Sequence, residues 1–66
     1  MVIKVIEVIG SSDKSWEDAA INAVEQAAKT VKHLIGVDVV NFTASVKDGK
    51  IIKYKACCKL AFEVKE

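Results

Sequence analysis

The chain opens with an apolar stretch that is rich in β-branched residues, residues 2–10, VIKVIEVIG. Such side chains pack well on a pleated surface, so this stretch predicts a β-strand. Successive side chains of a strand point to opposite faces, and here both faces are mostly apolar. We therefore expect both faces to be covered, which a 66-residue chain can hardly achieve by itself.

A helical pattern follows, because apolar residues recur at steps of three and four. The stripe comprises Trp16, Ala20, Ala23, Ala27, Val31 and Leu34. Ser12 or Ser15 can cap the first turn, and Ser15 with Asp18 has the spacing of a capping box. Gly36 stands where a helix commonly ends. The pattern predicts one long amphipathic helix.

Two more strands follow the helix. Residues 37–46, VDVVNFTASV, predict the second strand, and Asp48-Gly49 is a strong hairpin signal because a type I′ turn needs two positive φ angles. Apolar and polar residues then alternate from Ile52 to Lys65, which predicts a third strand. The order is β-α-β-β. We expect an α+β fold in which a three-stranded antiparallel sheet wraps around one long helix, in a single domain covering residues 1–66.

The third strand is long for so small a protein. About fifteen residues at ~3.3 Å each extend about 50 Å, whereas a compact chain of this length has a diameter near ~28 Å. The strand must bend sharply or overhang and pair with a neighbouring subunit. Since a small core alone is marginal and no disulfide or zinc pattern is present, the sequence predicts a homo-oligomer.

Composition excludes several functional classes. The net charge of +1 gives no strong field for nucleic acid, and no apolar run approaches the ~20 residues that span a bilayer. No secretory leader pattern is seen, so we expect a cytoplasmic protein with reduced thiols.

No catalytic constellation is recognised. Cys57 and Cys58 are adjacent, so they would point to opposite faces of a strand and act as small hydrophobic residues rather than as a disulfide. His33 has no partner cysteine or triad, and we interpret it as a surface residue helped by the helix dipole. The three glycines are scattered, so no phosphate loop is formed. The sequence predicts a protein that is not an enzyme.

Two polar sets have weaker alternative interpretations. A basic row on one face of the third strand comprises Lys53, Lys55, Lys59 and Lys65. We interpret it as a solvated face, or as one that lines the interior of an assembly. Asp38, Asn41 and Ser45 supply oxygen atoms, which calcium and magnesium prefer, but their spacing alone does not define a metal site.

Three segments together resemble one known family: KVIEVIGSS near the start, SWEDAA at the predicted helix start, and YKACCKLAFEV at the end. They resemble the dodecins, small flavin-binding proteins that form hollow dodecameric shells, and the resemblance covers roughly residues 3–64. It implies a sheet around a helix, strand pairing between subunits, flavins bound in pairs between subunits, and storage rather than catalysis.

The resemblance also implies where the ligand binds. In dodecins a tryptophan after the helix stacks on the flavin ring, and a glutamine after a tyrosine contacts its edge. Here these positions are Gly36 and Lys55, beside the retained Tyr54. The implied cofactor-binding residues are therefore Gly36, Val37, Asp38, Tyr54 and Lys55.

The two departures weaken flavin binding. Glycine removes an aromatic platform that is worth ~1–3 kcal/mol per stacked base, and lysine has no hydrogen-bond acceptor. Trp16 and Phe42 could supply another platform, but both are better interpreted as packing residues, with the Trp16 indole N–H bonded near the helix start.

The functional hypothesis is a dodecin-like dodecamer that binds a small-molecule ligand. The resemblance implies FMN or riboflavin as that ligand, and Gly36 and Lys55 weaken the expected affinity. The alternative is a flavin-free assembly that binds a metal ion such as calcium or another anionic ligand, or that is purely structural.

Overall fold

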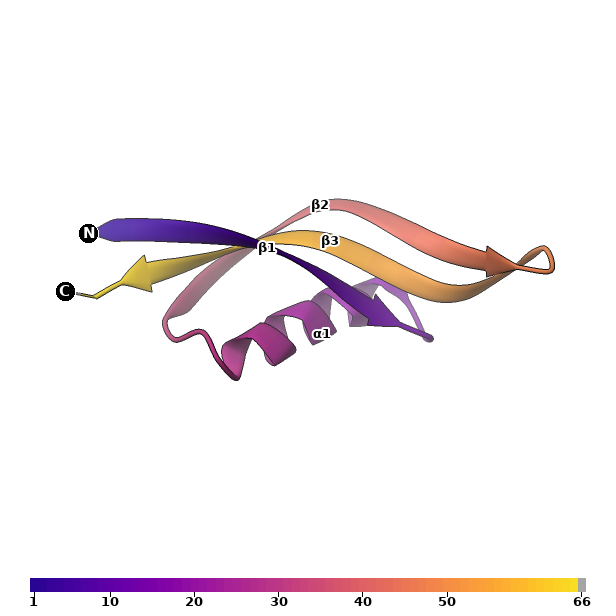
Figure 1. Cartoon of the computed structure of the whole chain (residues 1–66), viewed down its shortest axis with the longest axis horizontal. Helices are drawn as coiled ribbons and strands as arrows, with labels where there is room; N and C mark the ends of the chain where they lie inside the picture. The colour runs from indigo at the N-terminus through magenta and orange to yellow at the C-terminus, as the bar shows by residue number, and fades with distance from the viewer. Residues whose placement is uncertain (66) are drawn as a thin grey trace.

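The computed structural model describes residues 1–65 and contains three strands and one helix in that range (Figure 1). The elements are β1 (Val2–Ser12), α1 (Trp16–Ala28), β2 (Leu34–Lys47) and β3 (Lys50–Val64). The strands form one antiparallel sheet in the order β1-β3-β2, with β3 in the centre. The curved sheet lies over the helix, which confirms the predicted β-α-β-β order and the α+β class.

The two faces of the sheet have different surroundings. We call the face that packs on α1 the inner face and the opposite one the outer face. The buried core lies between α1 and the inner face, and it consists of Ala19, Ala23, Ala56, Cys58 and Leu60. Because side chains alternate along a strand, the odd-numbered residues of the central strand from Lys53 to Glu63 lie on the outer face, on the side of the sheet away from α1 (Figure 1).

Helix and sheet approach each other closely at Gly10. A Cβ atom at this position would lie 2.1 Å from the Ala19 carbonyl oxygen and 2.7 Å from the Ala23 Cβ atom. Real Cβ atoms do not come so close to other heavy atoms, so only glycine fits here. The small residues of both elements thus set the distance between α1 and β1.

The start of the helix confirms part of the prediction. Ser15 is the N-cap, and its hydroxyl accepts a hydrogen bond from the Asp18 backbone N–H at 3.0 Å. The expected capping box is only half formed, because the Asp18 carboxylate accepts from the buried Ser12 hydroxyl at 2.6 Å instead. Ser12 also accepts the Lys14 backbone N–H at 2.9 Å, so it holds the strand-to-helix connection together.

The predicted end of the helix is wrong. The helix ends at Ala28, so Val31 lies in the connection and Leu34 begins β2. The backbone N–H groups of Thr30 and Val31 both bond to the Ala27 carbonyl, which closes the last turn. The left-handed residue that ends this connection is His33, with φ of 64°, a conformation in which histidine is enriched. Gly36, which was expected to stop the helix, lies within β2 and needs no positive φ.

The hairpin turn is confirmed. Asp48 and Gly49 have φ angles of 52° and 74°, the two positive values that a type I′ turn requires. The adjoining strands run past the end of β1, whose last residue pairs with Tyr54. Residues 45–53, which we call the hairpin arm, therefore have no third strand beside them, and they project beyond α1 in Figure 1.

The arm gives the molecule an elongated shape. The principal extents are 51 × 19 × 13 Å, and the radius of gyration is 13.4 Å. A compact chain of this length would have a radius of gyration of about 11 Å. Of the two expected outcomes, a sharp bend or an overhang, the single chain shows the overhang, and pairing of the arm with a neighbouring subunit stays a prediction.

Candidate functional site

A shallow hollow on the outer face surrounds Gly36. Its volume is about 280 Å³, and its lining consists of Val5, Gly36, Val37, Asp38, Lys59 and Ala61. A Cβ atom built on Gly36 would meet only the Ala61 Cβ atom, at the ordinary contact distance of 3.9 Å. Neither the backbone angle nor the contacts of a Cβ atom within the chain thus require a glycine here.

A row of alternating charges crosses the sheet beside this hollow. Lys59 on the central strand pairs with Glu7 on one side and with Asp38 on the other. All three side chains are exposed, and the ion pair within residues 1–65 joins Lys65 to Glu63 instead. Lys59 therefore stands in register between two acidic residues of the outer face, and within residues 1–65 it forms no salt bridge with either.

The other two predicted binding residues lie far from Gly36. Ala61 pairs with Gly36, and Lys55 is six residues from Ala61 along the same strand, which is about 20 Å. Lys55 lies half-buried on the outer face, whereas Tyr54 lies half-buried on the inner face. One chain therefore brings Gly36, Val37 and Asp38 together but does not bring Tyr54 or Lys55 to them.

Tyr54 belongs to an aromatic cluster that the sequence analysis did not assemble. The Trp16 ring meets the Tyr54 ring edge to face, at a centroid distance of 4.8 Å, and the Phe42 ring at 6.4 Å. The Trp16 indole N–H donates to the Thr43 carbonyl at 2.7 Å, not to a partner near the helix start as expected. Trp16 packs the helix against the sheet, as expected of a packing residue, but it is 39% exposed and Phe42 is 51% exposed, so neither lies in the buried core of the single chain.

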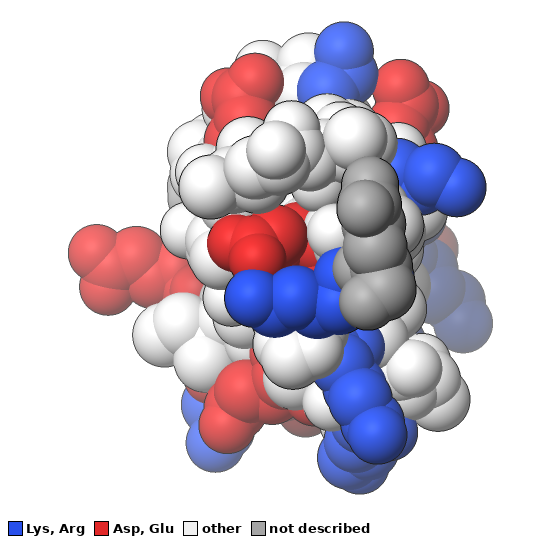
Figure 2. Space-filling view, turned by 90° about the vertical axis from the view of Figure 1, so that its left-hand side faces the viewer, with Lys and Arg blue, Asp and Glu red and all other residues white. Residues whose placement is uncertain are grey.

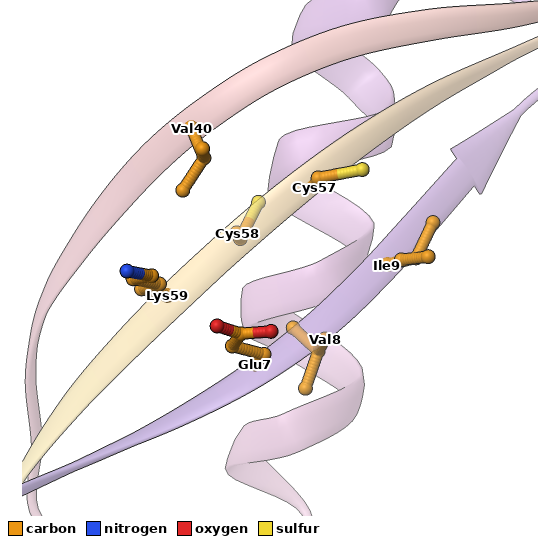
Figure 3. A pocket seen from close by; sticks show the side chains of 7 residues that line it. All are labelled: Glu7, Val8, Ile9, Val40, Cys57, Cys58 and Lys59. Carbon is orange, nitrogen blue, oxygen red and sulfur yellow. The ribbon is translucent and has the colours of Figure 1, made fainter.

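A second hollow lies on the outer face around Cys57, with a volume of about 330 Å³. Figure 3 shows Glu7 and Ile9 on β1, Cys57 and Lys59 on β3, and Val40 on β2 around it, with the helix behind the sheet. Lys59 also lines the Gly36 hollow, so the two hollows are neighbours.

The two cysteines are free thiols, as expected, and they belong to different faces. Cys58 is buried against the helix, whereas Cys57 is half-buried on the outer side. Burial raises the pKa of the Cys58 thiol, and the neighbouring Cys57 adds to the increase. Cys58 is therefore a protonated core residue at neutral pH.

The remaining polar candidates are spread out. Asp38, Asn41 and Ser45 lie along β2 opposite three different residues of β3. Within residues 1–65 no three His, Cys, Asp or Glu side chains are grouped to hold a metal ion. Figure 2 shows acidic and basic side chains interspersed at the end of the molecule that carries the termini. No helix in the described range is long and apolar enough to cross a membrane.

Sequence reasoning missed three lining residues of the Gly36 hollow, namely Val5, Lys59 and Ala61. Two of them had a usable signal, because counting back from the Asp48-Gly49 turn places Ala61 opposite Gly36 and Lys59 opposite Asp38. Val5 had none, since the register of β1 against β3 is not fixed by a short turn.

Comparison with known proteins gives a consistent match. The family model described as Dodecin matches residues 2–65. The calcium dodecin of Mycobacterium tuberculosis is 33% identical over 64 residues, which cover 97% of this chain and 90% of the relative. The dodecin of Thermus thermophilus is 26% identical over 65 residues, which cover 98% of this chain and 94% of the relative.

Solved structures match at the level of the fold as well. The dodecin from Streptomyces coelicolor has a TM-score of 0.95 and 29% identity, over 98% of this chain and 93% of that one. The crystal structure of the Mycobacterium tuberculosis calcium dodecin has a TM-score of 0.85 and 35% identity, over the same shares. That protein is described as calcium chelating, with a novel calcium-binding site.

Proposed function

This chain belongs to the dodecin family, and from that premise we propose that it is a non-catalytic protein that assembles into a dodecamer and binds a small ligand where copies meet. The accessible surface of the single chain supports self-association. It is 4856 Å², whereas a monomeric protein of 7.2 kDa exposes about 4,100 Å². Fourteen large hydrophobic residues are exposed, which is an unstable arrangement for an isolated chain in water.

The separation of the implied binding residues supports a ligand site between copies. Gly36 on β2 and Lys55 on β3 lie about 20 Å apart along the strand direction, because Gly36 pairs with Ala61, six residues from Lys55; this is longer than a three-ring aromatic system. A single flavin can therefore touch both positions only if they come from different chains. This separation is the observation that carries the proposal.

We expect FMN and riboflavin to bind weakly. The open space above Gly36 has no aromatic surface, and the hollow around it is lined by small aliphatic and charged side chains. Loss of ~1–3 kcal/mol of stacking per ring weakens binding by roughly 5- to 150-fold. Lys55 can donate to a flavin carbonyl oxygen but cannot accept the ring N–H, so the edge contact is weakened as well.

Flavin fluorescence titration of the wild type and of Gly36→Trp tests this account. We expect the tryptophan variant to bind riboflavin at least roughly fivefold more tightly, because a stacking platform is restored at a position where a Cβ atom meets only Ala61, at 3.9 Å. Gly36→Leu is the matched control, since it adds bulk but no aromatic face. Nanomolar binding by the wild type, or equal gains in both variants, would contradict the role assigned to Gly36.

A calcium ion is the second candidate ligand. The support is the 33% identical relative named calcium dodecin and the exposed Asp38 carboxylate beside the Gly36 hollow. Calcium takes six to eight oxygen ligands, so copies of Asp38 and Asn41 from several chains would have to contribute. Isothermal titration with Ca²⁺ tests this candidate: measurable heat that Asp38→Asn abolishes supports it, and no heat up to millimolar Ca²⁺ contradicts it.

A further inference from the structure

The aromatic cluster lies where the hairpin arm leaves the rest of the fold. We call Trp16, Phe42 and Tyr54 the aromatic patch. Trp16 is the first residue of α1, and the other two side chains come from the inner faces of β2 and β3. Beyond them the hairpin arm continues without helix cover (Figure 1). The patch is therefore the edge of the inner face at which the chain's own core ends.

The aromatic patch combines exposed aromatic rings with an indole N–H that is already hydrogen-bonded within the chain, and both features suit a contact with another protein surface. Trp16 and Phe42 are 39% and 51% exposed, while their rings already meet edge to face. The one strong polar donor, the Trp16 indole N–H, is bonded to the Thr43 carbonyl at 2.7 Å. Covering the Trp16 ring would therefore leave its indole N–H paired, so burying that group carries no desolvation penalty for an unpaired donor. Tryptophan and tyrosine are also the residues that most often dominate protein interfaces.

The size of the uncovered surface indicates another protein surface as the occupant. The single chain exposes 4856 Å², which is about 700 Å² more than expected for a monomer of its mass. A standard protein interface buries about 800 Å² per partner. The excess, which belongs to the whole elongated chain, is close to the area that one interface buries. The chain also carries apolar surface that a copy can offer, with Ile3, Val5 and Ile9 at least half exposed on the outer face of β1.

We propose that the aromatic patch is the contact surface for a second copy of this chain, with Trp16 as its central residue. The inference rests on the self-association proposed above and names the surface responsible for it. Trp16 thereby has two roles. It joins α1 to β2 within one chain, and its exposed face is covered only when a copy docks.

Phe42→Glu tests the proposal by introducing a charge into the patch at a residue that is half exposed in the single chain. Sedimentation velocity should show loss of the wild-type oligomer, with a self-association Kd at least about 30-fold higher, because an interface hot spot is removed. Thr30→Glu is the control, since it adds the same charge to the exposed loop after the other end of α1. It should leave the oligomer intact.

Trp16 is the only tryptophan, so intrinsic fluorescence reports its environment alone. We expect acrylamide to quench the wild-type emission weakly and the emission of Phe42→Glu strongly, with a shift to longer wavelength. An oligomer whose Trp16 is quenched as easily as in the variant would overturn the proposal while leaving self-association intact. A wild type that is a monomer would instead refute self-association itself. Quenching of Trp16 by riboflavin in the Phe42→Glu variant would identify a small aromatic ligand as the occupant and would also overturn the proposal.

Discussion

Replacing Gly10 by alanine should destabilise the fold far more than its single methyl group suggests. The added Cβ would lie 2.1 Å from the Ala19 carbonyl oxygen, whereas ordinary contacts begin near 3.4 Å. Helix α1 must therefore move away from β1 by more than 1 Å, and the closely packed core around Ala23 and Leu60 must loosen with it. Overpacking typically costs 1–3 kcal/mol, and the backbone position of this clash puts Gly10→Ala at about 3 kcal/mol.

Urea unfolding followed by circular dichroism at one fixed protein concentration measures this loss, since self-association makes stability depend on concentration. For a domain of this size, about 3 kcal/mol lowers Tm by roughly 12–24 °C. Gly36→Ala is the matched control: its Cβ meets Ala61 at 3.9 Å, and replacing a strand glycine should stabilise the chain by about 0.5–1 kcal/mol. A Gly10→Ala variant with the wild-type urea midpoint would refute the close-approach argument.

Three further changes have defined outcomes. Gly49→Val should destabilise the chain by about 1–2 kcal/mol in urea unfolding, because its φ of 74° is strained for a side chain; an unchanged midpoint would argue against the turn geometry. Ser15→Ala should remove about 1 kcal/mol by loss of the N-cap, and no loss of helix stability would mean that the cap contributes nothing. The raised pKa of Cys58 keeps the folded thiol protonated after the unfolded thiol ionises. The free energy of unfolding should therefore fall as pH rises from about 8.5 through the folded pKa, and Cys58→Ala should flatten that slope; an equal slope in both proteins would contradict it.

The hairpin shows how much local chemistry predicts. Asp48-Gly49 determined the turn, and counting back from it puts Gly36 opposite Ala61 even though two irregularities intervene, because the shift at Ser45/Val46 is reversed at Val39/Asn41. The end of α1 shows the opposite. Gly36 was the obvious stop signal, but Thr30 and Val31 leave the helix first and His33 adopts the left-handed conformation. The residues between Ala28 and Leu34 have only a weak intrinsic preference for helix. Whether such residues extend the helix or lead into a strand depends on pairing with the sheet, which a local sequence pattern does not show.

The candidate site was predictable only in part for a related reason. Its residue types were readable, and the hairpin register places Gly36 on β2 opposite Ala61, six residues along β3 from Lys55. The pattern of a single chain does not indicate which surface of another copy would bring the two positions together. The partner of the Trp16 indole N–H is 27 residues away in sequence, which no local pattern indicates. What a sequence of this length specifies well is each element. What it leaves open is where uncovered faces meet, within the chain and between copies.

The central claim is that this chain is stable only in association with copies of itself, so that its binding places are formed between them. Sedimentation velocity of purified protein at micromolar concentration tests it most directly. We predict a single species near twelve times 7.2 kDa, about 86 kDa. A folded species of 7.2 kDa, with the far-ultraviolet circular dichroism of the intact sheet and helix, would contradict the account.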